Sequence, residues 1–411
     1  MIKDRLLKSL YVSLWLTVLT FPVMVIRVNT IEDTVTWRWG NLLLILIGSY
    51  VFSLIWNYAL ERQERGKKVK TNKLSIKIKE IKATVSQSRP MKISGLAAVL
   101  VAVFLFPFLT SFYQMSIMNT ALMYVMLGLG LNITIGLGGI LNLGYIAFFM
   151  VGSYSYALLN QAIGLNFWIA LPIGGLVALI FGIIVAVPVL RLRGDYLAIV
   201  TLAFGEIMRI VVENWSSLTG GPSGIRSIPR PAIPGVDLNL IDTAKLVYFI
   251  MIVLAAFTIL ITLRLKDSRI GRALIAMRED EIACQSMGIN ITKVKVIAFA
   301  LGAVFAGVAG VVFAANTTFI NPASFTLWES VLVLCIVVLG GMGSIPGVIF
   351  AALVLKLMPE YLRAFSEYRM LVFGAVLVIM MVFKPGGLIP EKRKHYNFTN
   401  KDAADFEEED V

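Results

Sequence analysis

Apolar runs of about the length needed to cross a lipid bilayer recur along almost the whole chain. A transmembrane helix needs roughly 20 apolar residues, because the hydrocarbon core is about 30 Å thick. The candidate segments are 9–28, 41–60, 93–110, 116–135, 144–159, 167–190, 196–215, 244–263, 294–316, 327–339, 346–358 and 370–383. Two near the end are short enough to be tilted, partial or re-entrant, so we expect ten to twelve spans. The runs do not alternate, which predicts an all-α polytopic helical bundle rather than a β-barrel.

Positive charge sets the expected orientation. The segments 61–92 and 264–295 carry eleven and seven Lys or Arg residues, and basic loops remain on the cytoplasmic side. Alternate counting of the spans then places both termini in the cytosol. The loops on the other side are poor in positive charge: 29–40, 160–166, 216–243, 317–326 and 359–369. The basic juxtamembrane segments account for the net charge of +12, and they suit binding to acidic lipid at the membrane surface. No nucleic-acid partner is therefore expected.

The polar segment 264–295 interrupts the apolar series and contains a helical pattern. Ile270, Ala273, Leu274 and Met277 share one face, and Gly288 suits the end of a helix. Such a short amphipathic helix between two spans can lay its apolar face into a groove on a cytosolic partner. An ordinary loop lying on the lipid surface is the alternative, and the pattern alone leaves both open.

Several kinds of chemistry find no support in the sequence. His395 is the single histidine, and Cys284 and Cys335 are the two cysteines, so neither a Ser-His or Cys-His nucleophile nor a metal site is expected. No G-x-x-x-x-G-K-[ST] phosphate loop occurs, so we expect no ATP bound by that route. The chain is therefore not expected to be an enzyme or to hold a cofactor, and an ATP-driven function would need a partner.

Two glycine clusters mark places where a helix is weakened. Each glycine costs about 1 kcal/mol in a helix interior, and the clusters lie 202 residues apart, which suggests duplicated halves. Broken helices in corresponding halves of a transporter often border the substrate path, whereas small residues also allow close helix packing. The candidate path residues here are Gly138, Gly139, Asn142, Gly340, Gly341 and Ser344.

Glu206 and Arg209 lie one turn apart inside the predicted span 196–215. An unpaired charge there would cost roughly 2.5–3.5 kcal/mol, so both side chains need partners. Their spacing favours a structural ion pair. Glu206 facing a cavity would instead contact a substrate amino group, or would change protonation in a proton-coupled secondary transporter.

Several motifs in the same order resemble those of branched-chain amino acid ABC transporter permeases. In the loop they are Gly271-Arg272-Ala273, Arg278-Glu279-Asp280-Glu281 and Gly288-Ile289. Elsewhere they are LNITIGLGGILNLGYIAFF from residue 131, RLRGDYLAIVTLAFGEIMRI from 191, TGGPSGI from 219, LGGMGSIPG from 339 and KPGGL from 384. The resemblance covers residues 93–390, and the N-terminal extension is similar to that of the M-type subunits.

The resemblance implies a permease subunit that imports leucine, isoleucine and valine by alternating access. Its implied location is a bacterial plasma membrane. Its implied partners are a second homologous permease, two cytosolic ABC ATPases that use ATP, and an external substrate-binding protein. Relatives that import urea, amides or other amino acids look similar. The residues that the resemblance assigns to ATPase coupling are Gly271, Arg272, Ala273, Ala276, Arg278, Glu279, Asp280, Glu281, Ala283 and Gly288.

We accordingly expect four regions. An N-terminal extension with two spans covers residues 1–60, and a basic cytoplasmic linker covers 61–92. The permease core follows over 93–390 and includes the ATPase-coupling loop 264–293. A cytoplasmic tail, 391–411, ends the chain.

Overall fold

The computed structural model describes residues 26–29, 34–37, 103–189, 194–232, 239–361 and 386–390, with single positions at 101, 192, 374, 378 and 384. Two compact units, Met1–Ala102 and Val103–Val411, divide the chain. The predictions for residues 9–25, 41–100 and 391–411, and for nearly all of 370–383, lie outside the described residues.

In the first unit, the described residues form an antiparallel pair of strands. Strand β1 (Ile26–Asn29) pairs with β2 (Thr34–Trp37), and Ile26 lies opposite Trp37. The last residues of the predicted span 9–28 are therefore strand rather than helix. β-Branched residues in both segments, together with a short connection, favour a hairpin at this point.

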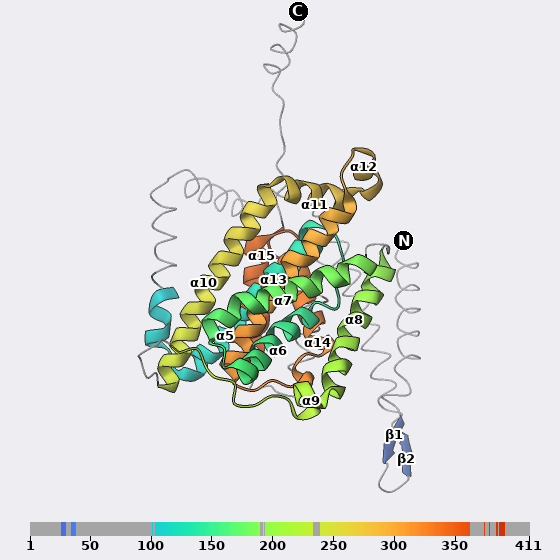
Figure 1. Cartoon of the computed structure of the whole chain (residues 1–411). Coiled ribbons are helices and arrows are strands. Elements are labelled where there is room, and N and C mark those ends of the chain that lie inside the picture. The colour runs from blue at the N-terminus through green and yellow to red at the C-terminus, as the bar shows by residue number, and fades with distance from the viewer. Residues whose placement is uncertain are drawn as a thin grey trace, which may run out of the picture. The chain divides into compact units, whose positions relative to one another are not determined.

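The described part of the second unit is helical (Figure 1). Its long helices are α5 (Phe112–Leu131), α6 (Ile146–Ile163), α7 (Phe167–Val189), α8 (Asp195–Asn214), α10 (Leu240–Asp267), α13 (Ile291–Thr317), α14 (Leu327–Gly340) and α15 (Ile345–Tyr361). The short elements are a π-helix, η1 (Asn132–Leu137), and η2 (Gly221–Ser223), η3 (Pro322–Ser324), α9 (Ser216–Thr219), α11 (Arg269–Glu279) and α12 (Glu281–Ser286).

Six helical segments among the described residues are long and apolar enough to cross a membrane. They are Phe112–Leu137, Ile146–Ile163, Phe167–Pro188, Leu240–Asp267, Ile291–Thr317 and Pro322–Gly340. This confirms the prediction of a polytopic helical membrane protein. Helix α8 matches the predicted span 196–215 closely in its ends, and Glu206, Arg209 and Glu213 make it more polar than these six.

Helix α13 lies at the centre of the unit and packs against both α6 and α7. Small residues allow this, since the backbones of Gly152 on α6 and Gly307 on α13 are so close that a Cβ at Gly152 would overlap the Gly307 carbonyl. Ser153 Oγ also donates a hydrogen bond to the Gly310 carbonyl of α13 at 2.9 Å. Membrane helices commonly associate through such small residues and interhelical hydrogen bonds.

The two ends of this bundle carry different short elements (Figure 1). Helices α11 and α12 lie at one end, which we call the α11 end. Helix α9 lies at the other, which we call the α9 end. There, a β-bridge between Ile225 and Ile320 joins the loop after η2 to the loop before η3.

Candidate functional site

The segment 264–295 forms two short helices rather than one. Helix α11 begins after Ser268, whose side chain accepts a hydrogen bond from the Gly271 amide, and ends before Asp280. Asp280 is extended and caps α12 by accepting hydrogen bonds from the amides of Ile282 and Ala283 at 2.8 and 2.9 Å. The chain leaves α12 through Gly288, whose φ of +80° is the left-handed conformation expected after a helix C-terminus.

The apolar face of α11 points into the protein's own bundle. Leu274 and Met277 are 0% and 5% exposed and belong to the main core, whereas Ile270 is 37% exposed. A Cβ added at Gly138 would lie 3.2 Å from Leu274 Cδ2. Leu274 and Met277 therefore cannot enter a partner's groove in this conformation, because the turn after η1 and helix α13 already cover them, whereas Ile270 of the same predicted face stays accessible.

The outward surface of this segment consists of other residues. Ile282 and Met287 are 65% and 83% exposed, and Ile275 lies at 36%. Arg272, Glu279 and Ala283 are exposed too, while Gly271 is buried against the end of α10 and Ala273 and Ala276 are half-buried. Any partner at this end would therefore meet this mixed surface, which we call the α12 surface, rather than the buried face of α11.

Glu281 forms an ion pair within the chain. Its carboxylate lies 2.7 Å from Lys295 Nζ on the first turns of α13, and the Lys295 side chain is only 5% exposed. A buried charge left without a partner is costly, so this pair fixes α12 against α13. Asp280 and Glu281, both predicted to couple to an ATPase, therefore bond within the chain.

Arg278 is exposed, but its guanidinium reaches the break at the end of α5. Its Nη1 donates a hydrogen bond to the Gly136 carbonyl at 2.6 Å. A Cβ added at Gly139 would lie 2.9 Å from Arg278 Cγ, and Gly139 has a φ of +66°, so a larger residue would be both strained and crowded. Helix α11 is thus joined directly to the segment that the glycine pattern predicted to be broken.

The two predicted glycine clusters lie against each other. Asn132 Oδ1 accepts a hydrogen bond from the Gly343 amide at 2.9 Å, and a Cβ at Gly136 would lie 2.6 Å from the same nitrogen. Asn132 and Asn142 are 0% and 2% exposed, and the Nδ2 atom of each has no hydrogen-bond partner within the described residues. The structure therefore brings together at the α11 end both glycine clusters and two buried side-chain amides, whose Nδ2 atoms have no hydrogen-bond partner among the described residues.

The second cluster shows close packing as well. The backbone of Gly340 contacts that of Gly347, and Gly341 contacts the chain at Gly386 and Ile389. Ser344 is buried and accepts a hydrogen bond from the Gly347 amide at 3.3 Å. At Gly340 and Gly341 the packing interpretation of these glycines is confirmed.

A pocket of about 290 Å³ opens beside this junction. It combines residues from the predicted path and from the predicted coupling loop. Its lining includes Gly138, Gly139, Arg278, Glu279, Glu281 and Lys295. These two groups were predicted separately, and the fold places them around one cavity.

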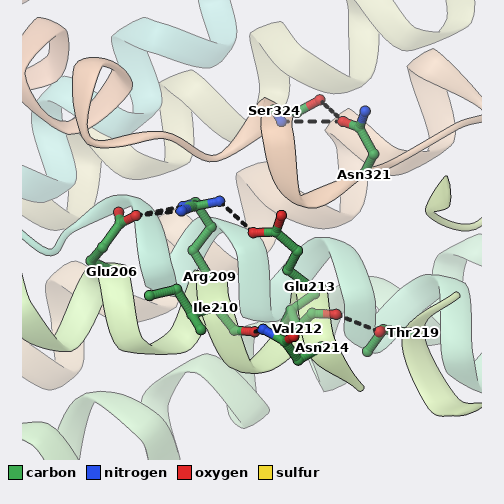
Figure 2. A network of polar contacts seen from close by, with 9 residues as sticks. All are labelled: Glu206, Arg209, Ile210, Val212, Glu213, Asn214, Thr219, Asn321 and Ser324. Atoms are coloured by element: carbon green, nitrogen blue, oxygen red, sulfur yellow. Dashed lines mark hydrogen bonds and ion pairs between the residues drawn. The ribbon is translucent and has the colours of Figure 1, made fainter. Parts of the chain in front are cut away.

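Glu206 lies apart from this junction, in a charged network on α8 (Figure 2). Arg209 Nε donates to Glu206 Oε1 at 2.8 Å, and Arg209 Nη1 donates to Glu213 Oε2 at 2.7 Å. The predicted pairing of Glu206 with Arg209 is confirmed. Glu213 was missed, although its spacing of four from Arg209 is the usual signal for a helical ion pair. The network carries one net negative charge, with side chains that are 23–39% exposed.

Comparison with known proteins identifies the family. Residues 113–381 match the family described as the branched-chain amino acid transport system / permease component. The chain is 44% identical over 325 residues to the high-affinity branched-chain amino acid transport system permease protein LivM of Escherichia coli K12, covering 74% of this chain and 76% of LivM.

More distant relatives and structures complete the comparison. The chain is 28% identical over 292 residues to the permease protein LivH of Salmonella typhimurium, covering 66% of this chain and 93% of LivH. It is 26% identical over 297 residues to a probable LivM of Methanocaldococcus jannaschii. No solved structure matches the chain. On the extent of the family match and the identity to LivM, the chain belongs to the branched-chain amino acid transport permease family.

Proposed function

We propose that this chain is the transmembrane permease subunit of an ABC importer for leucine, isoleucine and valine. The observation that carries the proposal is the family match over residues 113–381, together with 44% identity to a LivM named for high-affinity branched-chain amino acid transport. The helical membrane fold supports it. The substrate passes through the chain by movement of helices rather than by bond chemistry, and ATP is hydrolysed by separate subunits.

The names of the relatives support the proposed partners. LivM and LivH are both named as permeases of a high-affinity branched-chain amino acid system, and both align with this chain. A second homologous permease is therefore the natural partner in the membrane. Two ABC ATPases would supply the energy, and a binding protein would deliver substrate at the α9 end. With the basic segment 264–295 in the cytosol, the α11 end and both termini face the cytoplasm of a bacterial plasma membrane.

Coupling then takes place at the α11 end. The exposed Ile282 and Met287 on the α12 surface meet an ATPase, and Arg278 passes the movement of α11 to Gly136. The glycine-rich break borders the cytoplasmic part of the substrate path, together with Asn142 and Ser344, which belong to the two glycine clusters. In this arrangement Arg278 acts inside the permease, whereas the α12 surface makes the contact between subunits.

Affinity purification of the tagged chain from its own membrane, in mild detergent, tests this function. We expect a homologous permease and ATPase chains to co-purify, and the reconstituted complex to import leucine only with ATP and the binding protein. Urea and simple amides should not replace leucine as substrate. Recovery of the chain alone, with uptake driven by a proton gradient and lost in Glu206→Gln, would contradict the proposal and favour a secondary transporter.

A further inference from the structure

A charged cluster joins three helices that the predicted sites do not include. Glu329 lies in the first turn of α14, Lys356 on α15 and Tyr124 on α5. The Tyr124 hydroxyl donates a hydrogen bond to Glu329 Oε2. Lys356 Nζ lies 3.9 Å from that same oxygen and 3.4 Å from the centroid of the Tyr124 ring. A carboxylate and an ammonium group are therefore held side by side against an aromatic face.

Two of the three residues lie in segments that are long and apolar enough to cross a membrane, Tyr124 in Phe112–Leu137 and Glu329 in Pro322–Gly340. Lys356 lies on α15, which packs against α5 and α14 but is not one of those segments. Tyr124 is 8% exposed, while the side chains of Lys356 and Glu329 are 19% and 33% exposed, so both charges remain within reach of a small molecule. Ionisable residues inside membrane segments are expensive and commonly mark the route of a substrate.

Part of the bonding capacity of this pair is unused. An ammonium group has three donors, yet Lys356 makes no hydrogen bond to any of the residues that the structure describes. Within the same residues, Glu329 Oε1 has no partner, because both contacts of that carboxylate use Oε2. We expect a purely structural ion pair to make more hydrogen bonds, because these offset the free-energy cost of removing both charges from water.

We propose that Lys356 and Glu329 bind the carboxylate and the ammonium group of the permeating amino acid. An α-amino acid carries an ammonium group and a carboxylate on the same carbon atom, so one molecule can meet both side chains of a pair whose charged atoms lie 3.9 Å apart. Urea and simple amides carry neither charge. This inference rests on the proposed function and deepens it, because it places selection for zwitterionic amino acids in the permease itself.

Equilibrium binding of labelled leucine to the purified permease–ATPase complex, without the binding protein, tests the site. We expect Lys356→Gln and Glu329→Gln each to weaken binding at least tenfold. Leucine methyl ester lacks the carboxylate charge and 4-methylpentanoate lacks the ammonium group, so each should compete at least tenfold more weakly than leucine. The competition series uses the unaltered protein and does not depend on whether a variant assembles.

Two controls separate binding from stability. Lys245→Gln breaks a different helical ion pair, with Asp242 at 3.2 Å, and should leave leucine binding unchanged. Tyr124→Phe keeps both charges and should retain binding within about threefold. Unfolding temperatures of all variants report the structural role of the pair independently.

Three results would overturn the site. These are no saturable leucine binding at millimolar concentration, equal competition by the methyl ester, or unchanged binding in assembled Lys356→Gln and Glu329→Gln complexes. If the complete system still imports leucine under any of these results, the site alone fails and the importer function stands. Absence of leucine import by the complete system would instead count against the function.

Discussion

Replacing Arg278 by methionine tests whether α11 acts directly on the broken end of α5. The guanidinium donates to the Gly136 carbonyl at 2.6 Å, and a hydrogen bond from a charged group contributes about 1.5–3 kcal/mol. The Arg278 side chain is exposed, so we take the lower end of that range. About 1.4 kcal/mol corresponds to a tenfold change in an equilibrium constant. We therefore expect the ratio of leucine imported to ATP hydrolysed to fall roughly tenfold.

The assay uses proteoliposomes that contain the complete complex, with saturating binding protein and simultaneous measurement of uptake and phosphate release. ATP hydrolysis should continue in Arg278→Met, because the α12 surface is untouched. Lys245→Met is the control, since it removes a cation and its ion pair with Asp242 on α10, outside both the α12 surface and the contact with Gly136. An unchanged ratio in Arg278→Met, or an equal loss in Lys245→Met, would refute the role of Arg278 in coupling.

Three further substitutions test the packing and the charges. Gly152→Ala should clearly lower the unfolding temperature in detergent, because the new Cβ overlaps the Gly307 backbone. Gly175→Ala is the control and should have a smaller effect, since its Cβ would lie 3.0 Å from a Val side chain that can move. Equal effects of the two substitutions would contradict this prediction. Glu281→Gln leaves Lys295 buried without its carboxylate and should cost about 2–3 kcal/mol, below the roughly 3–5 kcal/mol of a fully buried pair. The amides of residues 281–286 should then exchange hydrogen faster, and slower exchange would contradict the predicted loss of stability. Arg209→Gln leaves two carboxylates unpaired on α8 and should reduce the amount of protein in the membrane more than loss of either carboxylate, as immunoblots of membrane fractions can show.

Much of the fold follows from the length and continuity of the apolar runs. The predicted span 167–190 and helix α7, Phe167–Val189, agree to one residue, because the run is uniformly apolar and bounded by polar loops. The break after α5 was also predictable, since several glycines weaken the helix together. The hairpin at 26–37 was not, because its strands are short and continue an apolar stretch.

The candidate site was less predictable, for two physical reasons. Helical periodicity shows that Leu274 and Met277 share a face, but it does not show what covers that face. Long-range contacts leave no periodic trace, so nothing in the spacing of Glu329 and Lys356 indicates that separate helices bring them together. The contact of Arg278 with Gly136 belongs to the same class, because its acceptor is a backbone carbonyl 142 residues away.

Contact between the two glycine clusters explains how a small movement of α11 could reach helices on both sides of the junction. Arg278 holds the Gly136 carbonyl, and the neighbouring Asn132 holds the Gly343 amide, so η1 is linked both to α11 and to the turn between α14 and α15. Closely packed backbones cannot absorb a displacement by compression. The turn after η1 also packs against Leu274, which would still carry part of the movement without Arg278. This second contact is the reason for expecting a tenfold loss of coupling, rather than a complete one, in Arg278→Met.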